Sequence, residues 1–259
     1  MRQLDIQKSA AALLEAERKK QPIPPFTAST DISVDDAYQI QLLQIEEKLK
    51  NAKLKGMKIG LTSKVMQQMF HVDTPDFGHI LNTMIFENNG DISKAQFIQP
   101  KVEFELAFIL KKDLIGPNVT AEEVFKATEA IAPAIEIIDS RIIDWQFKFQ
   151  DTVADNGSSA GAIIGTPTFV NSLDELANIR IVAKQNGEII DEGISNAVMD
   201  NPANAVAWLA NMLSEYDISL KAGQFILSGA ITAAVPFEVG DQFEVDYGKY
   251  GQVKVTFTE

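Results

Sequence analysis

The 259-residue sequence contains no cysteine and only two histidines, His71 and His79. Without cysteine, the chain has no disulfide, no thiolate nucleophile and no zinc site built on sulfur. The scarcity of histidine argues against a histidine-rich metal centre and against most Ser-His-Asp catalytic schemes. Neither histidine has the spacing of a metal ligand, so both are predicted to be structural.

Long hydrophobic runs and excess positive charge are also missing. No apolar run reaches the roughly 18 residues that a membrane span needs, and residues 1–5 lack the apolar core of a signal peptide. The formal net charge of -13 argues against nucleic acid as a partner. No Walker or dinucleotide glycine pattern is present, so no nucleotide site is predicted. We therefore expect a cytoplasmic protein without a membrane or nucleic-acid partner.

The distribution of helix and strand signals predicts an α+β fold. Hydrophobic residues make up 46% of the chain, enough for a substantial core. Helical patterns occupy residues 3–20 and the stretch after Ser33, whereas strand patterns dominate after Asn88-Asn89-Gly90. We expect a small helical amino-terminal region over residues 1–83, followed by a β-rich, metal-binding catalytic domain over residues 84–259.

Shorter elements follow from local signals. Residues 55–62 are predicted as a strand, 64–70 as a short helix capped by Ser63, and 71–78 as a turn-rich loop. Thr120 is predicted to cap a helix that runs to about residue 130. The remaining expected elements are a hairpin of 178–184 with 188–192, a helix from Asn201, and strands at 224–228, 243–247 and 252–257.

Two predicted strands carry acidic residues among apolar ones. Over residues 100–110 the alternation places Glu103 and Glu105 on one face, with Val102, Phe104, Leu106 and Phe108 on the other. A second apolar run, residues 131–139, carries Glu136 in its middle, where an isolated charge is costly. Three carboxylates embedded in strands indicate one hard divalent cation held by oxygen ligands. The alternative is a solvated sheet face on which Glu103 and Glu105 bind nothing.

Two further charged residues allow both a structural and a catalytic interpretation. Lys58 lies on an apolar strand, where a lysine can act as an acid or base, although an extended surface lysine is the commoner outcome. Asp76 follows Pro75 in a turn-like segment, where aspartate usually bonds its own backbone. The alternative for Asp76 is a carboxylate above the metal that moves a proton. Spacing and composition alone favour the structural interpretation of both residues.

Two polar segments offer hydroxyl and N–H groups at strand ends. Residues 151–161 are polar and small and lead into an apolar strand, an arrangement that suits an anion such as a carboxylate. Residues 227–230, which include Ser228, form a similar small turn after a strand. Either segment is equally compatible with an ordinary loop.

Several motifs occur together in the order of a known family. They are Lys58-Ile59-Gly60-Leu61-Thr62-Ser63, Pro75-Asp76-Phe77-Gly78, Glu103-Phe104-Glu105, Glu136-Ile137-Ile138-Asp139-Ser140-Arg141, Asp151-Thr152-Val153-Ala154-Asp155-Asn156 and Leu227-Ser228-Gly229. Over essentially its whole length the chain resembles the 2-keto-4-pentenoate hydratases of the fumarylacetoacetate-hydrolase-like superfamily.

The resemblance implies a mixed β-roll and a set of site residues. Glu103, Glu105 and Glu136 match the carboxylates that bind Mg²⁺ or Mn²⁺ in this family. Lys58 and Asp76 match the positions given acid–base roles, so the resemblance shifts both toward the catalytic interpretation. The matching substrate-binding positions are Ser158, Leu61 and Ser228.

The resemblance also implies a reaction. We expect metal-dependent hydration of 2-hydroxypenta-2,4-dienoate, or a close homologue, to 4-hydroxy-2-oxopentanoate in aromatic meta-cleavage catabolism. One alternative is the sister activity, 4-oxalocrotonate (2-oxohex-3-enedioate) decarboxylase, on the same scaffold. Another is a catalytically silent subunit that binds a partner enzyme. Homo-oligomers, and association with a sister decarboxylase or hydratase, are expected from the same resemblance.

Overall fold

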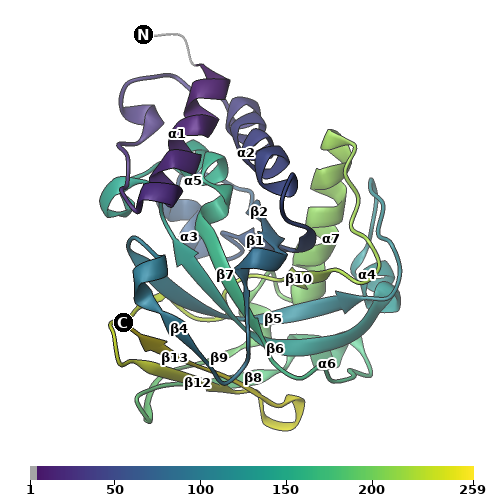
Figure 1. Ribbon diagram of the computed structural model, residues 1–259. Coiled ribbons are helices and arrows are strands. Elements are labelled where there is room, and N and C mark those ends of the chain that lie inside the picture. Colours follow the sequence, from purple (N-terminus) through teal and green to yellow (C-terminus); the bar gives the residue numbers. More distant parts are fainter. Residues whose placement is uncertain (1–4) are drawn as a thin grey trace.

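The computed structural model describes residues 5–259, and its helices and strands form two β-sheets with helices around them (Figure 1). Helix α1, Ile6–Lys19, begins after Asp5, whose side chain accepts from the Lys8 amide. The predicted helix over residues 3–20 is therefore confirmed from residue 6 to 19, and residues 3 and 4 lie outside the described part. The predicted α+β class, with amino-terminal helices and mixed β-structure, is confirmed.

Helix α2, Val34–Leu49, packs against α1 and begins with the capping box of Ser33 and Asp36. Its buried face includes two amide side chains as well as apolar ones. Gln41 Nε2 donates to the carbonyls of Phe77 and Val153, and Gln44 Nε2 donates to the carbonyl of Ala154. These bonds tie α2 to β2 and to helix α5, Phe149–Ala154.

The larger sheet has the strand order β2-β1-β10-β5-β6-β7-β3, and β11 also pairs with β5. Its strands are β1 Leu54–Gly60, β2 Asp76–Leu81, β3 Ile85–Phe86, β5 Pro100–Leu110, β6 Thr128–Asp139, β7 Ser159–Ile164, β10 Phe225–Leu227 and β11 Val235–Pro236. β1 with β10 and β3 with β7 are parallel pairs, and the other pairs are antiparallel.

The smaller sheet has the order β4-β13-β12-β8-β9. Its strands are β4 Gly90–Ser93, β8 Arg180–Gln185, β9 Glu188–Ile194, β12 Gln242–Asp246 and β13 Gln252–Thr258. Asn186 and Gly187 both have positive φ, 55° and 86°, which confirms the predicted hairpin and fits a type I′ turn. The two sheets share an apolar core in which Phe104 of β5 packs on Phe243 of β12.

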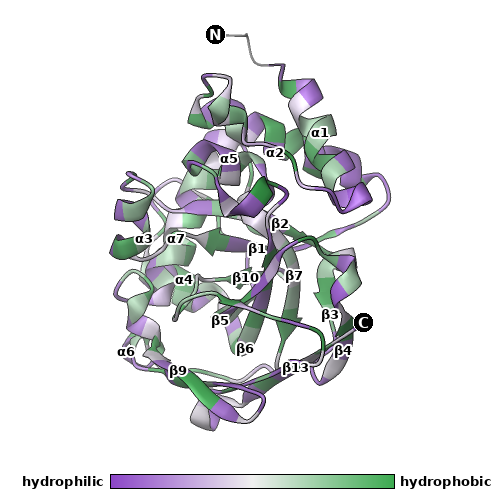
Figure 2. Cartoon of the chain, turned by 90° about the vertical axis from the view of Figure 1, so that its left-hand side faces the viewer, coloured by the Kyte–Doolittle hydropathy of each residue, from purple (hydrophilic) through white to green (hydrophobic). Residues whose placement is uncertain are grey.

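The remaining helices lie around the larger sheet. They are α3 Lys64–Met69, α4 Ala121–Ala127, α6 Leu173–Ala177 and α7 Pro202–Leu213. α4 packs against α7 on one side of the molecule, α1, α2 and α5 gather at one end, and the smaller sheet closes the opposite end (Figures 1 and 2). No helix within residues 5–259 is long and apolar enough to cross a membrane.

Two sequence predictions about local structure are wrong. Asp76 does not lie in a turn, because β2 begins there and pairs with β1, with Asp76 opposite Gly60. The helix after Thr120 ends at Ala127, because Thr128 already pairs with Leu110 in the β5–β6 ladder. In both cases long-range strand pairing overrides local propensity.

β1 and β2 come from the predicted amino-terminal region, yet they join the same sheet as β5 and β6. The expected domain boundary near residue 84 remains a prediction. Since β1 lies beside β10, and β10 lies beside β5, the residues before and after that boundary can contribute to one site.

Candidate active site

The site begins at the central strand pair of the larger sheet. Glu103 of β5 lies directly opposite Glu136 of β6, and Glu105 is two residues further along the same face of β5. Carboxylate oxygens of all three residues lie within 4.8 Å of one another. Glu105 and Glu136 are fully buried, whereas Glu103 is partly exposed. The convergence of these three side chains, expected from the sequence, is present.

Strand register also places Lys58 and Asp76 on this face. Residues directly opposite one another in a sheet project to the same side. Lys58 pairs with Leu227, and Leu227 pairs with Ala107, which shares the face of Glu105. Asp76 lies opposite Gly60, two residues after Lys58. Figure 2 shows these strands side by side, with α1 and α2 at one end and the smaller sheet at the other.

Lys58 is 3% exposed and projects among these acidic groups. Its Nζ lies 3.7 Å from Glu136 Oε2 and donates to the carbonyl of Gly157 at 2.9 Å. Space for the side chain comes from missing Cβ atoms. A Cβ on Gly60 would lie 3.1 Å from Lys58 Nζ and 2.1 Å from Asp76 Oδ1, and one on Gly78 would lie 3.2 Å from Lys58 Cγ.

Burial and mutual repulsion shift the titration of the carboxyl groups upward. Burial raises the pKa of Glu136 to about 7 against the opposing attraction of Lys58. Burial, followed by repulsion from Glu136 and Glu103, raises the pKa of Glu105 well above its usual value. Burial also raises the pKa values of Glu103 and Asp76. These shifts mean that ionising the carboxyl groups is unfavourable without a compensating cation.

Lys58 shows the opposite balance. Burial alone would lower its pKa, but attraction to Glu136, Asp76 and the other site carboxylates outweighs burial and raises it. The lysine therefore stays protonated at neutral pH. With Glu103, Glu105, Glu136 and Asp76 ionised, one lysine leaves three negative charges uncompensated.

The donor set fits a hard divalent cation. Within residues 5–259, several buried oxygens of the site have no hydrogen-bond partner. They are Oδ1 of Asp76, Oε1 of Glu105 and both carboxylate oxygens of Glu136. Buried carboxylate oxygens without partners require an explanation, and an oxygen-liganded ion supplies both charge and coordination.

The polar segment that contains Ser158 packs against this cluster. The Asn156 side chain makes two hydrogen bonds to β2: its Oδ1 accepts from the His79 amide and its Nδ2 donates to the His79 carbonyl. The next residue, Gly157, accepts from Lys58. Ser158 is 2% exposed and its hydroxyl contacts Asp155 Oδ2 at 3.3 Å. Ser158 therefore lies one residue from a direct Lys58 contact.

A buried ion pair holds that segment in place. Arg141 Nε donates to Asp155 Oδ1 at 2.7 Å, and the Arg141 amide donates to Asp155 Oδ2 at 3.0 Å. The guanidinium also donates to the carbonyls of Asp139 and Ser159. Burial raises the pKa of Asp155 to about 6 despite the adjacent Arg141.

The other two expected substrate contacts flank the cluster. Leu61 follows β1 in a left-handed conformation, with φ of 56°, and is partly exposed. Ser228 follows β10 and is fully buried, and its hydroxyl has no partner within residues 5–259. The next amide, that of Gly229, donates to Glu105 Oε2 at 2.7 Å.

One contact at the site, and one on the opposite face of the larger sheet, had no signal in the sequence. The hydroxyl of Tyr247, next to β12, donates to the carbonyl of Glu105 at 2.7 Å and so links the smaller sheet to a site strand. His79, predicted to be structural, is buried against Gln41, and burial lowers its pKa to about 4. Both contacts join residues that are distant along the chain.

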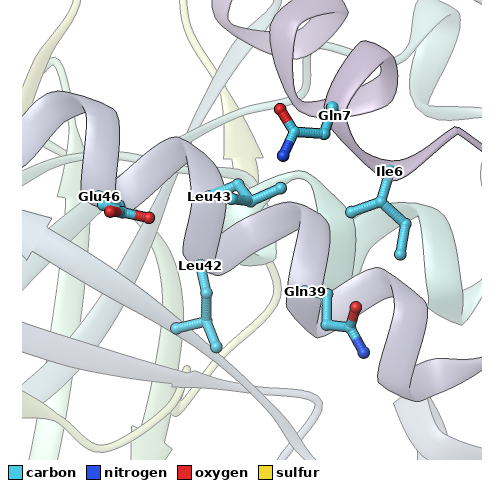
Figure 3. A pocket seen from close by; sticks show the side chains of 6 residues that line it. All are labelled: Ile6, Gln7, Gln39, Leu42, Leu43 and Glu46. Atoms are coloured by element: carbon cyan, nitrogen blue, oxygen red, sulfur yellow. The ribbon is translucent and has the colours of Figure 1, made fainter.

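A separate pocket of about 450 Å³ lies between α1 and α2, and Figure 3 shows its lining. The lining side chains are Ile6, Gln7, Gln39, Leu42, Leu43 and Glu46. None of the clustered site residues lines it, and it contains one ionisable group. It therefore offers no chemistry comparable to the carboxylate cluster.

Comparison with known proteins agrees with this geometry. Residues 49–258 match the family described as fumarylacetoacetate (FAA) hydrolase C-terminal. The chain is 44% identical to a 2-hydroxyhexa-2,4-dienoate hydratase of Comamonas testosteroni, over 98% of each chain. It is 42% identical to a 2-oxo-hept-4-ene-1,7-dioate hydratase of Escherichia coli, over 96% of each.

Solved structures show the same relationship. A 4-oxalocrotonate decarboxylase from Pseudomonas putida G7, complexed with magnesium and adipate, superposes with a TM-score of 0.91. It is 32% identical and covers 99% of this chain and 100% of that chain. The sequence match, the shared fold and the acidic strand pair together establish that this chain belongs to the fumarylacetoacetate hydrolase family.

Proposed function

We propose that this protein is a metal-dependent hydro-lyase that converts 2-hydroxypenta-2,4-dienoate, or a close homologue, to 4-hydroxy-2-oxopentanoate. The observation that supports it most is the convergence of Glu103, Glu105 and Glu136 beside the buried Lys58. The full-length hydratase relatives support the same reaction class.

In this proposal Glu103, Glu105 and Glu136 hold one divalent cation, Mg²⁺ or Mn²⁺. Oxygen-only ligands suit either ion. The decarboxylase relative was solved once with magnesium and adipate and once with calcium and acetate. When bound, the cation supplies Lewis-acid stabilisation of negative charge on the 2-oxo oxygen.

The reaction needs a balanced set of proton transfers. The dienol loses its hydroxyl proton and gains one at C5, which gives an enone. Water oxygen then bonds to C4, water loses a proton, and C3 gains one. Positioned acid–base groups can contribute about 10²–10⁴-fold to such steps.

We assign these transfers to Lys58 and Asp76. Lys58 stays protonated among the carboxylates, so it is suited to stabilise negative charge on the substrate. A divalent cation on those carboxylates would weaken their attraction for the lysine proton, which would let Lys58 supply it. Asp76 has a raised pKa because of burial, which makes its carboxylate a stronger base than an ordinary aspartate. Ser158, Leu61 and Ser228 would contact the substrate around this pair.

The decarboxylase activity is the second candidate, because a decarboxylase shares the fold at a TM-score of 0.91. A substrate panel separates the possibilities. With Mg²⁺, the purified protein should remove the ultraviolet absorbance of 2-hydroxypenta-2,4-dienoate, chelator should stop the reaction, and Mn²⁺ should restore it. Release of CO₂ from 2-oxohex-3-enedioate without hydration would favour the decarboxylase. Turnover of neither substrate would favour a silent partner subunit.

Membership of this family also suggests how the protein assembles and where in the cell it is located. We propose homo-oligomers, association with a sister decarboxylase, and a cytoplasmic location. Light scattering on the purified chain, alone and mixed with the decarboxylase, tests the first two.

A further inference from the structure

Glu103 is the one partly exposed metal-ligand candidate of the carboxylate cluster. Lys101 precedes Glu103 by two residues on β5, so both side chains project to the same face. Lys101 pairs with Ile138, which lies two residues beyond Glu136 on β6. Lys101 therefore lies beside the most exposed member of the cluster, and we call this edge of the cluster the mouth of the site.

Lys101 is half-buried, and Glu103 attracts it across a gap that is too long for an ion pair. No ion pair within 4.0 Å joins it to any acidic residue in the described part of the chain. Its Nζ instead lies 4.2 Å from the centroid of the Trp145 ring. The indole attracts the ammonium group but carries no net charge, so this contact does not cancel the positive charge of Lys101.

The Trp145 ring, which we call the platform, is fixed by a hydrogen bond and by a strained backbone. The indole Nε1 donates to the carbonyl of Gln99 at 3.0 Å. Asp144 and Trp145 both have positive φ, 53° and 56°, a strained conformation that accumulates at functional sites. Phe147 packs on Trp145, and Phe70, next to α3, stacks on Phe147 at 5.6 Å. The platform is thus joined to the segment between β1 and β2.

The charge balance of the site indicates that Lys101 offsets the repulsion of an anionic substrate. The chain carries a formal net charge of -13, and the site itself has an excess of carboxylates even with a divalent cation bound. The proposed substrate is an anion and is repelled by both. A cation at the mouth of a site can raise the association of an anionic ligand by about 10-fold or more.

We propose that Lys101, seated on Trp145, is a substrate-binding residue that attracts the carboxylate of the incoming 2-oxo or 2-hydroxy acid. The inference rests on the proposed function. It makes Lys101 a determinant of KM, whereas Lys58 and Asp76 determine kcat.

The test compares Lys101→Met with the wild type at two ionic strengths. Charges are screened weakly at about 0.01 M and strongly at about 0.5 M. We expect KM for 2-hydroxypenta-2,4-dienoate to rise about tenfold at low salt with kcat within twofold, and the difference to shrink at high salt. Lys101→Arg should restore KM. Lys184→Met, which removes a lysine 3.6 Å from Glu244 on the smaller sheet, should leave KM unchanged.

Binding of 2-oxopentanoate, an unreactive saturated analogue, to the Mn²⁺-loaded protein gives a readout that is independent of turnover. Calorimetry should show the same loss of affinity in Lys101→Met. An unchanged affinity and KM, or a loss that does not depend on salt, would overturn the inference, and the latter would indicate a structural role through Trp145. If the wild type binds the analogue but hydrates nothing, the proposed function fails while the Lys101 inference is still judged by affinity. If the wild type does not bind the analogue, both fail.

Discussion

Gly60→Ala is the substitution whose effect follows most directly from the geometry. A Cβ at residue 60 would lie 2.1 Å from Asp76 Oδ1 and 3.1 Å from Lys58 Nζ. Real Cβ atoms essentially never approach another heavy atom within 3.0 Å, so the carboxylate must move by about 0.9 Å. Asp76 cannot retreat as a unit, because its backbone pairs with Gly60 in the β1–β2 ladder.

The expected loss is mainly catalytic. A displacement of about 1 Å at a reacting group can cost about 10²-fold in rate, and overpacking a buried site costs about 1–3 kcal/mol of folding free energy. We predict that kcat for 2-hydroxypenta-2,4-dienoate falls about 100-fold. Mn²⁺ affinity should change by less than about threefold, because no ligand candidate touches the new methyl group.

A matched control separates strain from catalysis. Gly116→Ala would place a Cβ 2.5 Å from the carbonyl of Ala210 on α7, a similar clash that touches no member of the carboxylate cluster. It should lower stability in urea denaturation while kcat stays near the wild-type value. Wild-type kcat in a folded Gly60→Ala variant would refute the placement of Asp76 and Lys58 in the reaction.

Three further predictions address charge. Glu103, Glu105 and Glu136 must all be ionised to bind metal, and burial raises the pKa of each, that of Glu136 to about 7. Mn²⁺ affinity should therefore weaken as the pH falls, by about tenfold or more between about pH 8 and pH 6; a calorimetric titration that shows no pH dependence would contradict this. Arg141→Met leaves Asp155 buried without its partner and should cost about 3–5 kcal/mol in urea unfolding; wild-type stability would contradict the anchoring role. Lys58→Met should lower kcat by about 10²–10⁴-fold while Mn²⁺ binding is retained or tightened, because a positive charge leaves the cluster; measurable activity near the wild-type level would remove Lys58 from the proton transfers.

The acidic strand β5 could be predicted because its signal is local. Alternation with period two places Glu103 and Glu105 on one face whatever the rest of the chain does. The flanking aliphatic residues of Glu136 likewise indicated burial. What the sequence could not supply is the register that sets Glu136 opposite Glu103, since pairing partners are fixed by tertiary structure.

Asp76 illustrates the opposite case. Its neighbours Pro75 and Gly78 are typical of a turn, but pairing with β1 makes it the first residue of a buried strand. The absence of a side chain on Gly60, which admits the carboxylate, has meaning only when both strands are in place. Lys101 and Tyr247 were missed for the same reason, because their partners lie 44 and 142 residues away along the chain.

A titration of the metal-free protein with Mn²⁺, followed by electron paramagnetic resonance, tests whether the three glutamates form one metal centre. We predict one tight ion per chain in the wild type. In Glu105→Gln, which keeps the shape of the side chain, affinity should fall by more than about 100-fold, beyond the loss typical of residues that only support ligands. Circular dichroism should show that the variant stays folded. Wild-type Mn²⁺ affinity in folded Glu105→Gln, or no tight site in the wild type, would contradict a metal centre built on these three glutamates.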